Sequence, residues 1–179
     1  LLNLAALLKQ KSFFLFGPRA TGKTTLIRHD IPHCRLYDLL DARTYGRLLS
    51  NPALIEEENR ADPRIIVIDE IQKMPVLLDE VHRLIEIHSW RFLLTGSSAR
   101  KLKRGAANLL AGRAWQASLM PLTSYEIPDF NLLRYLNCGG MPAVYYSANP
   151  SEELENYVAL YLQEEIQAES LTRNLPQFS

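Results

Sequence analysis

An eight-residue segment near the start of the chain, Gly17 to Thr24 (GPRATGKT), restricts the fold more than any other feature. It matches the pattern GxxxxGK(S/T), in which two glycines allow a tight turn before a lysine and a hydroxyl. The apolar run Ser12 to Phe16 precedes the segment, and a helical pattern, Thr24 to His29, follows it. A strand, a glycine-rich turn and a helix in this order predict one βα unit of a mainly parallel sheet.

The chemistry of this segment favours a nucleoside triphosphate as its ligand. Gly17 and Gly22 permit a backbone that turns N–H groups toward phosphate oxygens, and the positive end of the following helix adds to the attraction. The Lys23 side chain reaches β- and γ-phosphates, and the Thr24 hydroxyl is placed to bind Mg²⁺. The predicted nucleotide-binding residues are Gly17, Pro18, Arg19, Ala20, Thr21, Gly22, Lys23, Thr24 and Thr25.

Five short apolar runs alternate with helical patterns along the first part of the chain. Several of these runs are continuous rather than alternating, which is typical of parallel strands covered on both faces. The pattern predicts an α/β fold with a five-stranded, mainly parallel sheet. The expected strands are Ser12–Phe16, Arg35–Leu39, Arg64–Asp69, Arg91–Thr95 and Ala114–Leu119.

Two acidic residues, Asp69 and Glu70, end the third of these runs. Open α/β sheets bind their ligands at the carboxyl ends of the strands. Asp69 suits the coordination shell of Mg²⁺, and Glu70 suits a general base or water-positioning role in hydrolysis. A solvated strand end is the alternative for such a pair in isolation. Its combination with the phosphate-binding segment favours the catalytic interpretation.

The fourth run ends in Gly96, Ser97 and Ser98. We expect this strand to lie between the strand that leads into the phosphate-binding segment and the strand that bears the acids. A small hydroxyl there would hydrogen-bond the γ-phosphate or the attacking water, and Ser97 is the candidate. The alternative is that one of the two serines caps the helix that follows.

Composition limits the classes of protein to which the chain belongs. The 179 residues include 20 Lys and Arg against 20 Asp and Glu, so the formal net charge is zero. This balance does not favour nucleic acid or an anionic membrane as the main ligand, although the basic run ARKLKR leaves nucleic acid open. Two cysteines make no disulfide framework, and no apolar run approaches the ~20 residues of a membrane helix. We expect a cytoplasmic protein.

The pattern changes after Pro121. We predict two domains, an α/β core at residues 1–122 and a helical segment at residues 123–179. The strongest helical pattern begins near Ser151, which we expect to be its N-cap, and Glu152 and Glu153 follow in the first turn.

Six sequence blocks resemble a known family: GPRATGKT, IDEIQKMPVLL, LTGSSARKL, LAGRA, PLTSYE and GGMPAVY, in this order. They are similar to AAA-type bacterial and archaeal ATPases that carry a C-terminal domain of unknown function. The similarity runs from about Ser12 to the end of the chain. It implies a three-layer P-loop NTPase sandwich with strand order 5-1-4-3-2. It also implies that a further C-terminal domain follows Ser179.

The resemblance also implies a role for Arg113, which lies directly before the fifth expected strand. In AAA-type proteins an arginine in this region reaches the γ-phosphate of a neighbouring subunit, where it neutralises developing charge. The alternative is an ion pair that tethers the loop to an acid such as Glu126. Arg100 and Arg104 are competing candidates for the same role.

Together these features predict Mg²⁺-dependent binding and hydrolysis of ATP, with Lys23, Glu70, Ser97 and Arg113 in the catalytic site. ATP is favoured over GTP because no Asn-Lys-x-Asp guanine-reading motif is present. A small-molecule kinase is disfavoured, because acids at a strand end suit water activation. A nucleotide-dependent regulatory switch with little turnover, acting with DNA or a protein partner, is the alternative. A homo-oligomer is compatible with both.

Overall fold

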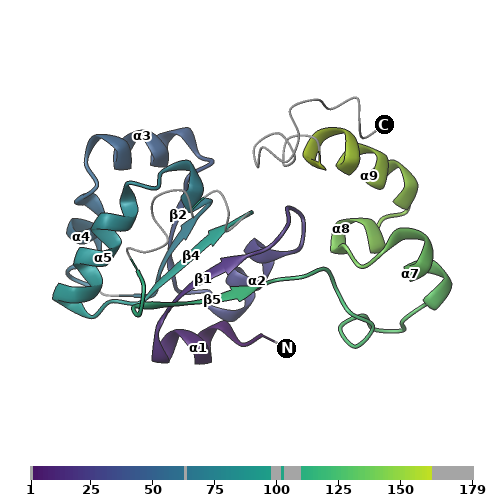
Figure 1. Ribbon diagram of the computed structural model, residues 1–179, viewed down its shortest axis with the longest axis horizontal. Coiled ribbons are helices and arrows are strands. Elements are labelled where there is room, and N and C mark those ends of the chain that lie inside the picture. The colour runs from purple at the N-terminus through teal and green to yellow at the C-terminus, as the bar shows by residue number, and fades with distance from the viewer. Residues whose placement is uncertain (1, 63, 98–101, 103–109, 163–179) are drawn as a thin grey trace. The chain divides into compact units, whose positions relative to one another are not determined.

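A parallel sheet of five strands organises the first part of the chain (Figure 1). We describe it from a computed structural model, which describes residues 2–62, 64–97, 102 and 110–162. The chain divides into two units, one of Leu1–Gly17 with Lys23–Leu119, the other of Pro18–Gly22 with Met120–Ser179.

The strand order of the sheet is β2-β3-β4-β1-β5, and every neighbouring pair is parallel. This confirms the expected α/β class and the order 5-1-4-3-2, read from the other edge. Because β4 lies between β1 and β3, the carboxyl ends of these three strands meet at one edge of the sheet. The strands are β1 Ser12–Phe16, β2 Arg35–Asp38, β3 Ile66–Asp69, β4 Phe92–Gly96 and β5 Ala114–Ser118.

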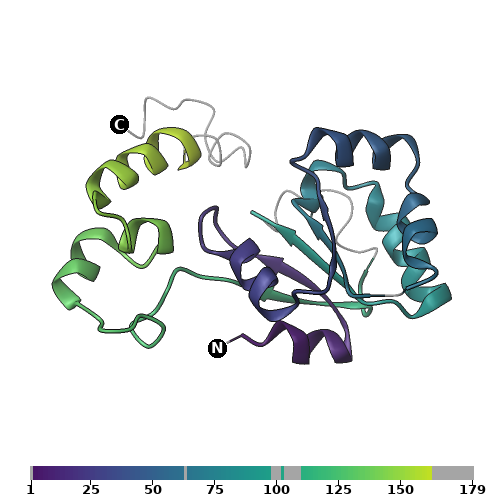
Figure 2. The same cartoon turned by 180° about the vertical axis from the view of Figure 1, so that it is seen from behind.

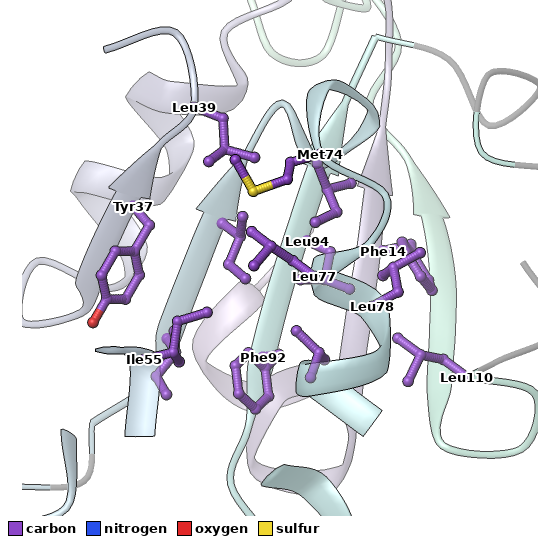
Figure 3. Packing of buried hydrophobic residues seen from close by; sticks show 14 of the residues in the cluster. Phe14, Tyr37, Leu39, Ile55, Met74, Leu77, Leu78, Phe92, Leu94 and Leu110 are labelled. Atoms are coloured by element: carbon purple, nitrogen blue, oxygen red, sulfur yellow. The ribbon is translucent and has the colours of Figure 1, made fainter. Parts of the chain in front are cut away.

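Alternate residues of the central strands point to opposite faces of the sheet, and both faces are buried. Ile68 belongs to the core on one face, together with Phe14 and Leu94, which Figure 3 labels. Phe13 and Leu93, which are paired in register, belong to the core on the other. Full burial of one such side chain contributes about 1.5–3 kcal/mol. Burial on both faces therefore explains why these strands are continuous apolar runs.

Helices cover both faces of the sheet (Figures 1 and 2). α1 and α2 pack on the face that holds Phe13, and α3, α4 and α5 pack on the face that holds Phe14. α3 is capped by Asp41, whose carboxylate accepts from two backbone N–H groups of the first turn. The helices are α1 Leu4–Gln10, α2 Lys23–Asp30, α3 Ala42–Ser50, α4 Leu54–Asn59 and α5 Leu77–His88, with the short 3₁₀ helix η1 Ile71–Lys73.

The second unit has helices and its own small core of Ile127, Cys138, Val144 and Tyr145. The expected N-cap at Ser151 is wrong. α9 begins at Pro150, and its N-cap position is Asn149, two residues before the expected one; Asn149 makes no side-chain cap bond. The elements are α7 Leu132–Cys138, α8 Pro142–Tyr145, α9 Pro150–Asn156 and the π-helical turn η2 Tyr157–Leu162. Among the described residues of the whole chain, no helix has the length and apolar character needed to cross a bilayer.

Candidate functional site

The lysine of the glycine-rich segment is buried at the start of α2. Lys23 is only 7% exposed, and its ammonium group donates to the carbonyl oxygen of Gly17, 2.6 Å away. Gly17 follows the end of β1 directly and donates its own N–H to the carbonyl oxygen of Gly96, at the end of β4. A buried cation thus lies beside the carboxyl ends of two central strands, a position that suits an anionic ligand.

The turn between β1 and α2 uses unusual backbone angles. Gly22 has a φ of +90°, which L side chains rarely adopt, and Ala20 has a φ of +61°. The hydroxyl of Thr21 donates to the carbonyl oxygen of Pro18, 2.8 Å away, and this bond closes the turn. Backbone held in sparsely populated regions is concentrated at binding sites, where the surrounding structure determines its conformation.

Asp69 ends β3 and is 7% exposed. One of its carboxylate oxygens accepts a hydrogen bond from the hydroxyl of Thr95, a fully buried residue of β4. The other carboxylate oxygen lies 3.4 Å from the hydroxyl of Thr24 in the first turn of α2. The structure therefore brings together the two residues predicted to bind Mg²⁺.

Glu70 follows Asp69 but has a different backbone conformation, with φ +59° and ψ +44° in the left-handed region. Its N–H donates to the Thr95 hydroxyl oxygen at 3.3 Å, and its carboxylate accepts a hydrogen bond from the side-chain amide of Gln72. The same Thr95 hydroxyl thus accepts from Glu70 while it donates to Asp69. Left-handed backbone at a glutamate is strained, and this hydrogen bond helps to hold it.

Ser97 directly follows β4, which lies between β1 and β3 as expected. Its side chain is 9% exposed, and its oxygen accepts from the Gln72 amide at 3.3 Å. Ser98, the other serine considered, lies outside the described residues.

Arg113 lies in the turn before β5, and its guanidinium donates to the carboxylate of Glu86 on α5. This ion pair holds the pKa of Glu86 below its ordinary range. The partner is therefore not Glu126, whose carboxylate instead accepts from Thr123. Arg100 and Arg104 lie outside the described residues.

The oxygen donors at this edge of the sheet suit Mg²⁺. Mg²⁺ is usually held by one or two carboxylates together with substrate phosphates and retained waters. Asp69 supplies one carboxylate and Thr24 one hydroxyl, and their oxygens are neighbours. Among the described residues, no group of three or more His, Cys, Asp or Glu side chains is arranged to hold a metal ion by itself. The donor set fits a metal that arrives with a phosphate ligand.

Residues 9–128 match the model of a family described as AAA domain. The chain belongs to this family. The match includes the phosphate-binding segment, Asp69, Glu70, Ser97 and Arg113, and it confirms the expected AAA-type P-loop ATPase domain. No curated protein is significantly similar to the chain.

Two solved structures share the fold of this AAA domain protein. The Aeropyrum pernix ORC1 protein in complex with DNA has a TM-score of 0.56 and 15% identity, with 95% of this chain and 60% of that chain covered. The replication initiator DnaA bound to AMPPCP and single-stranded DNA has a TM-score of 0.54 and 13% identity, with 94% and 60% covered. The chain thus spans 60% of the length of each. At these identities the similarity establishes the fold.

Sequence reasoning located the ends of β1, β3 and β4 but missed two polar residues that connect them. Thr95 forms hydrogen bonds with Asp69 and Glu70, and Gln72 forms hydrogen bonds with Glu70 and Ser97. A threonine inside the otherwise apolar run FLLTG was the available signal for the first. For Gln72 the only signal was a polar residue two positions after the acids.

Proposed function

We propose that this AAA domain protein binds Mg·ATP at Gly17–Thr25 and hydrolyses it. The observation that carries the proposal is the set of groups at one edge of the sheet: a buried ammonium, a hydroxyl beside a carboxylate, and a second carboxylate on strained backbone. Buried charge and strained backbone cost folding free energy, and both are typical of functional sites.

The roles of the side chains follow from their positions. Lys23 and the turn backbone bind the phosphates, and Thr24 and Asp69 hold Mg²⁺. When bound, the ion neutralises charge on the phosphate oxygens. The Glu70 carboxylate accepts a proton from the attacking water, and the Ser97 hydroxyl donates to the γ-phosphate or orients that water.

We also propose that the active form involves more than one copy of the chain. This rests on the resemblance to AAA-type ATPases, in which an arginine in the region of Arg113 reaches the γ-phosphate of a neighbouring subunit. Arg113 lies within residues 9–128, which match the AAA domain family. Nucleotide state would then be transmitted through residues 123–179, which we propose as a separate helical segment, to a further domain or to a protein partner.

The test combines ATP titration with steady-state phosphate release. Lys23→Ala should abolish ATP binding, because it removes the buried cation of the phosphate-binding segment. Glu70→Gln should keep Mg·ATP binding and lose about 10²–10⁴-fold in turnover, the range for loss of a general base. Lys9→Ala and Glu57→Gln, at exposed helix positions, are the matched controls and should change neither quantity.

Turnover by Glu70→Gln equal to that of the unaltered protein would remove Glu70 from the mechanism. Tight ATP binding by the unaltered protein, without turnover, would favour the regulatory switch instead. Since the two solved structures compared above contain DNA, the assay is run with and without DNA.

A further inference from the structure

One side chain of unassigned role, Gln72, links the ends of β3 and β4. It lies in η1, two residues after Glu70. Its Nε2 group donates to the Glu70 carboxylate and to the Ser97 hydroxyl oxygen, the latter at 3.3 Å. The glutamate and the serine that the proposed mechanism requires are therefore held by the same amide.

The orientation of this amide follows from charge. If the amide were turned over, its carbonyl oxygen would face the Glu70 carboxylate, and the two oxygens would repel each other. The Nε2 group must therefore face Glu70. In this orientation the Oε1 atom is buried, and within the described part of the chain it has no hydrogen-bond partner. Buried acceptors without a partner are rare in native proteins, and each calls for an explanation. We would not expect a glutamine that served only to stabilise the fold to leave a buried acceptor without a hydrogen-bond partner.

The neighbouring residue, Gly96, leaves the space that this amide occupies. A Cβ atom at position 96 would lie under 3.0 Å from the Oε1 atom of Gln72. Its other close neighbour, a ring carbon of Phe16, would be at an ordinary contact distance of 3.5 Å. Gly96 has no positive φ, so the need for glycine arises from the Gln72 side chain and not from the backbone.

The two restraints on Glu70 act on different parts of the residue. The Thr95 hydroxyl holds its backbone N–H, and Gln72 holds its carboxylate. A general base must be oriented before it is effective, and a third group commonly supplies that orientation.

We propose that Gln72 is a positioning residue that fixes the Glu70 carboxylate beside Ser97, and that Gly96 is required because it makes room for the Gln72 amide. This inference rests on the ATP hydrolysis proposed above. Gln72 touches neither phosphate nor water in this role, and it acts on the reaction only through Glu70 and Ser97.

The decisive variant is Gln72→Met, which keeps the length of the side chain but removes both polar groups. We expect kcat to fall about 10–100-fold, because proper placement of a base accounts for effects of this size. KM for ATP should stay unchanged, since the phosphate-binding residues are intact. The urea midpoint should change little, because the loss of the two Nε2 hydrogen bonds is offset by the removal of a buried unpaired oxygen. Lys73→Met, at the exposed next position, is the control.

A double-mutant cycle tests the same idea through Gly96. Gly96→Ala should displace the amide and lower kcat as much as Gln72→Ala does. Gly96→Ala in the Gln72→Ala background should add nothing, because the side chain that it would displace is absent.

The outcomes separate the two proposals. If the unaltered protein hydrolyses ATP and Gln72→Met has the same kcat, the positioning role is overturned while the proposed function stands. A fall in the urea midpoint of Gln72→Met that parallels its fall in kcat would also overturn the positioning role, because Gln72 would then act on stability. Additive effects of Gly96→Ala and Gln72→Ala in the double-mutant cycle would overturn it as well. An unaltered protein that binds but does not hydrolyse ATP overturns the proposed function and this inference with it.

Discussion

The hydroxyl of Thr24 lies 3.4 Å from a carboxylate oxygen of Asp69, although the two residues are 45 positions apart in the sequence. Thr24 is in the first turn of α2, and Asp69 is the last residue of β3. The parallel sheet causes this proximity, because it brings the carboxyl ends of its central strands to one edge. The contact connects the phosphate-binding segment to the acid-bearing strand.

This contact predicts a change in metal requirement. Asp69→Asn should raise the Mg²⁺ concentration needed for half-maximal ATP binding by about tenfold or more, because a neutral amide replaces the only carboxylate proposed as a Mg²⁺ ligand. The measurement is ATP binding at a fixed ATP concentration while the Mg²⁺ concentration is increased. Asp79→Asn, at an exposed position of α5, is the control. Equal Mg²⁺ dependence in the two variants would exclude Asp69 as a ligand.

Thr95 supports both acids, so its hydroxyl should matter for stability and for turnover. Thr95→Val has nearly the same shape but leaves the buried Asp69 oxygen and the Glu70 N–H without this partner. We expect the free energy of unfolding to fall by about 1–3 kcal/mol, the cost of unsatisfied buried polar groups. We also expect slower hydrolysis. Urea unfolding and phosphate release check the two effects, and Thr95→Ser should restore most of each.

Local patterns explain why much of this site could be predicted from the sequence. Gly22, Lys23 and Thr24 follow one another in a short motif, and the acids come directly after an apolar run. Thr95 and Gln72 were missed because their contacts depend on how β3 pairs with β4. Thr95 meets Asp69 across 26 positions of sequence, and Gln72 meets Ser97 across 25.

Two helix starts were not predicted, for different reasons. α1 is short, although a local signal was present, because the side chain of its N-cap Asn3 accepts from the N–H of Ala6; its first N–H is bonded by Asp30, a residue distant in the sequence. At α9 we expected Ser151 as the N-cap, whereas the N-cap position is Asn149. The fixed φ of Pro150 suits the first helical position, so the helix starts there.

A cluster around Glu56 predicts how stability depends on pH. The Glu56 carboxylate is hydrogen-bonded to Arg83, Arg60 and His88. These contacts, of which the one with Arg83 has the largest effect, lower the pKa of Glu56 from 4.5 to about 2. A carboxyl group with a lowered folded-state pKa stabilises the fold above its unfolded pKa and loses this contribution as the pH falls through the folded value. Glu56 should therefore stabilise the protein at neutral pH and progressively less between about pH 4.5 and pH 2.

The variant Glu56→Gln tests this dependence. It should lower the melting temperature at neutral pH and make the decline at acidic pH shallower than in the unaltered protein. Glu57→Gln, which removes an exposed carboxylate next to it, is the control. If the melting temperatures of Glu56→Gln and the unaltered protein depend on pH in the same way, the Arg83 and Arg60 contacts do not act through the charge of Glu56.

The last prediction separates two roles for Arg113, and its ion pair with Glu86 makes the separation possible. The pair is partly exposed, with side-chain exposures of 37% and 53%, and such pairs contribute about 0–1 kcal/mol. Arg113 is therefore held only weakly by this contact. If it acts on the nucleotide of a neighbouring copy, specific ATPase activity should rise with protein concentration. Arg113→Ala should then keep ATP affinity and lose up to roughly 10³-fold in turnover.

Glu86→Gln removes the same ion pair but leaves the arginine in place. If Arg113 is catalytic, the turnover of Glu86→Gln should match or exceed that of the unaltered protein. If Arg113 is only a tether, Glu86→Gln and Arg113→Ala should have the same effect on turnover. Mixing Arg113→Ala with Lys23→Ala should restore some activity, because Lys23→Ala supplies its arginine to the intact phosphate-binding segment of the other copy. Specific activity that is independent of concentration, with no recovery in the mixture and equal effects of Arg113→Ala and Glu86→Gln, would return Arg113 to the role of a tether between α5 and the turn before β5.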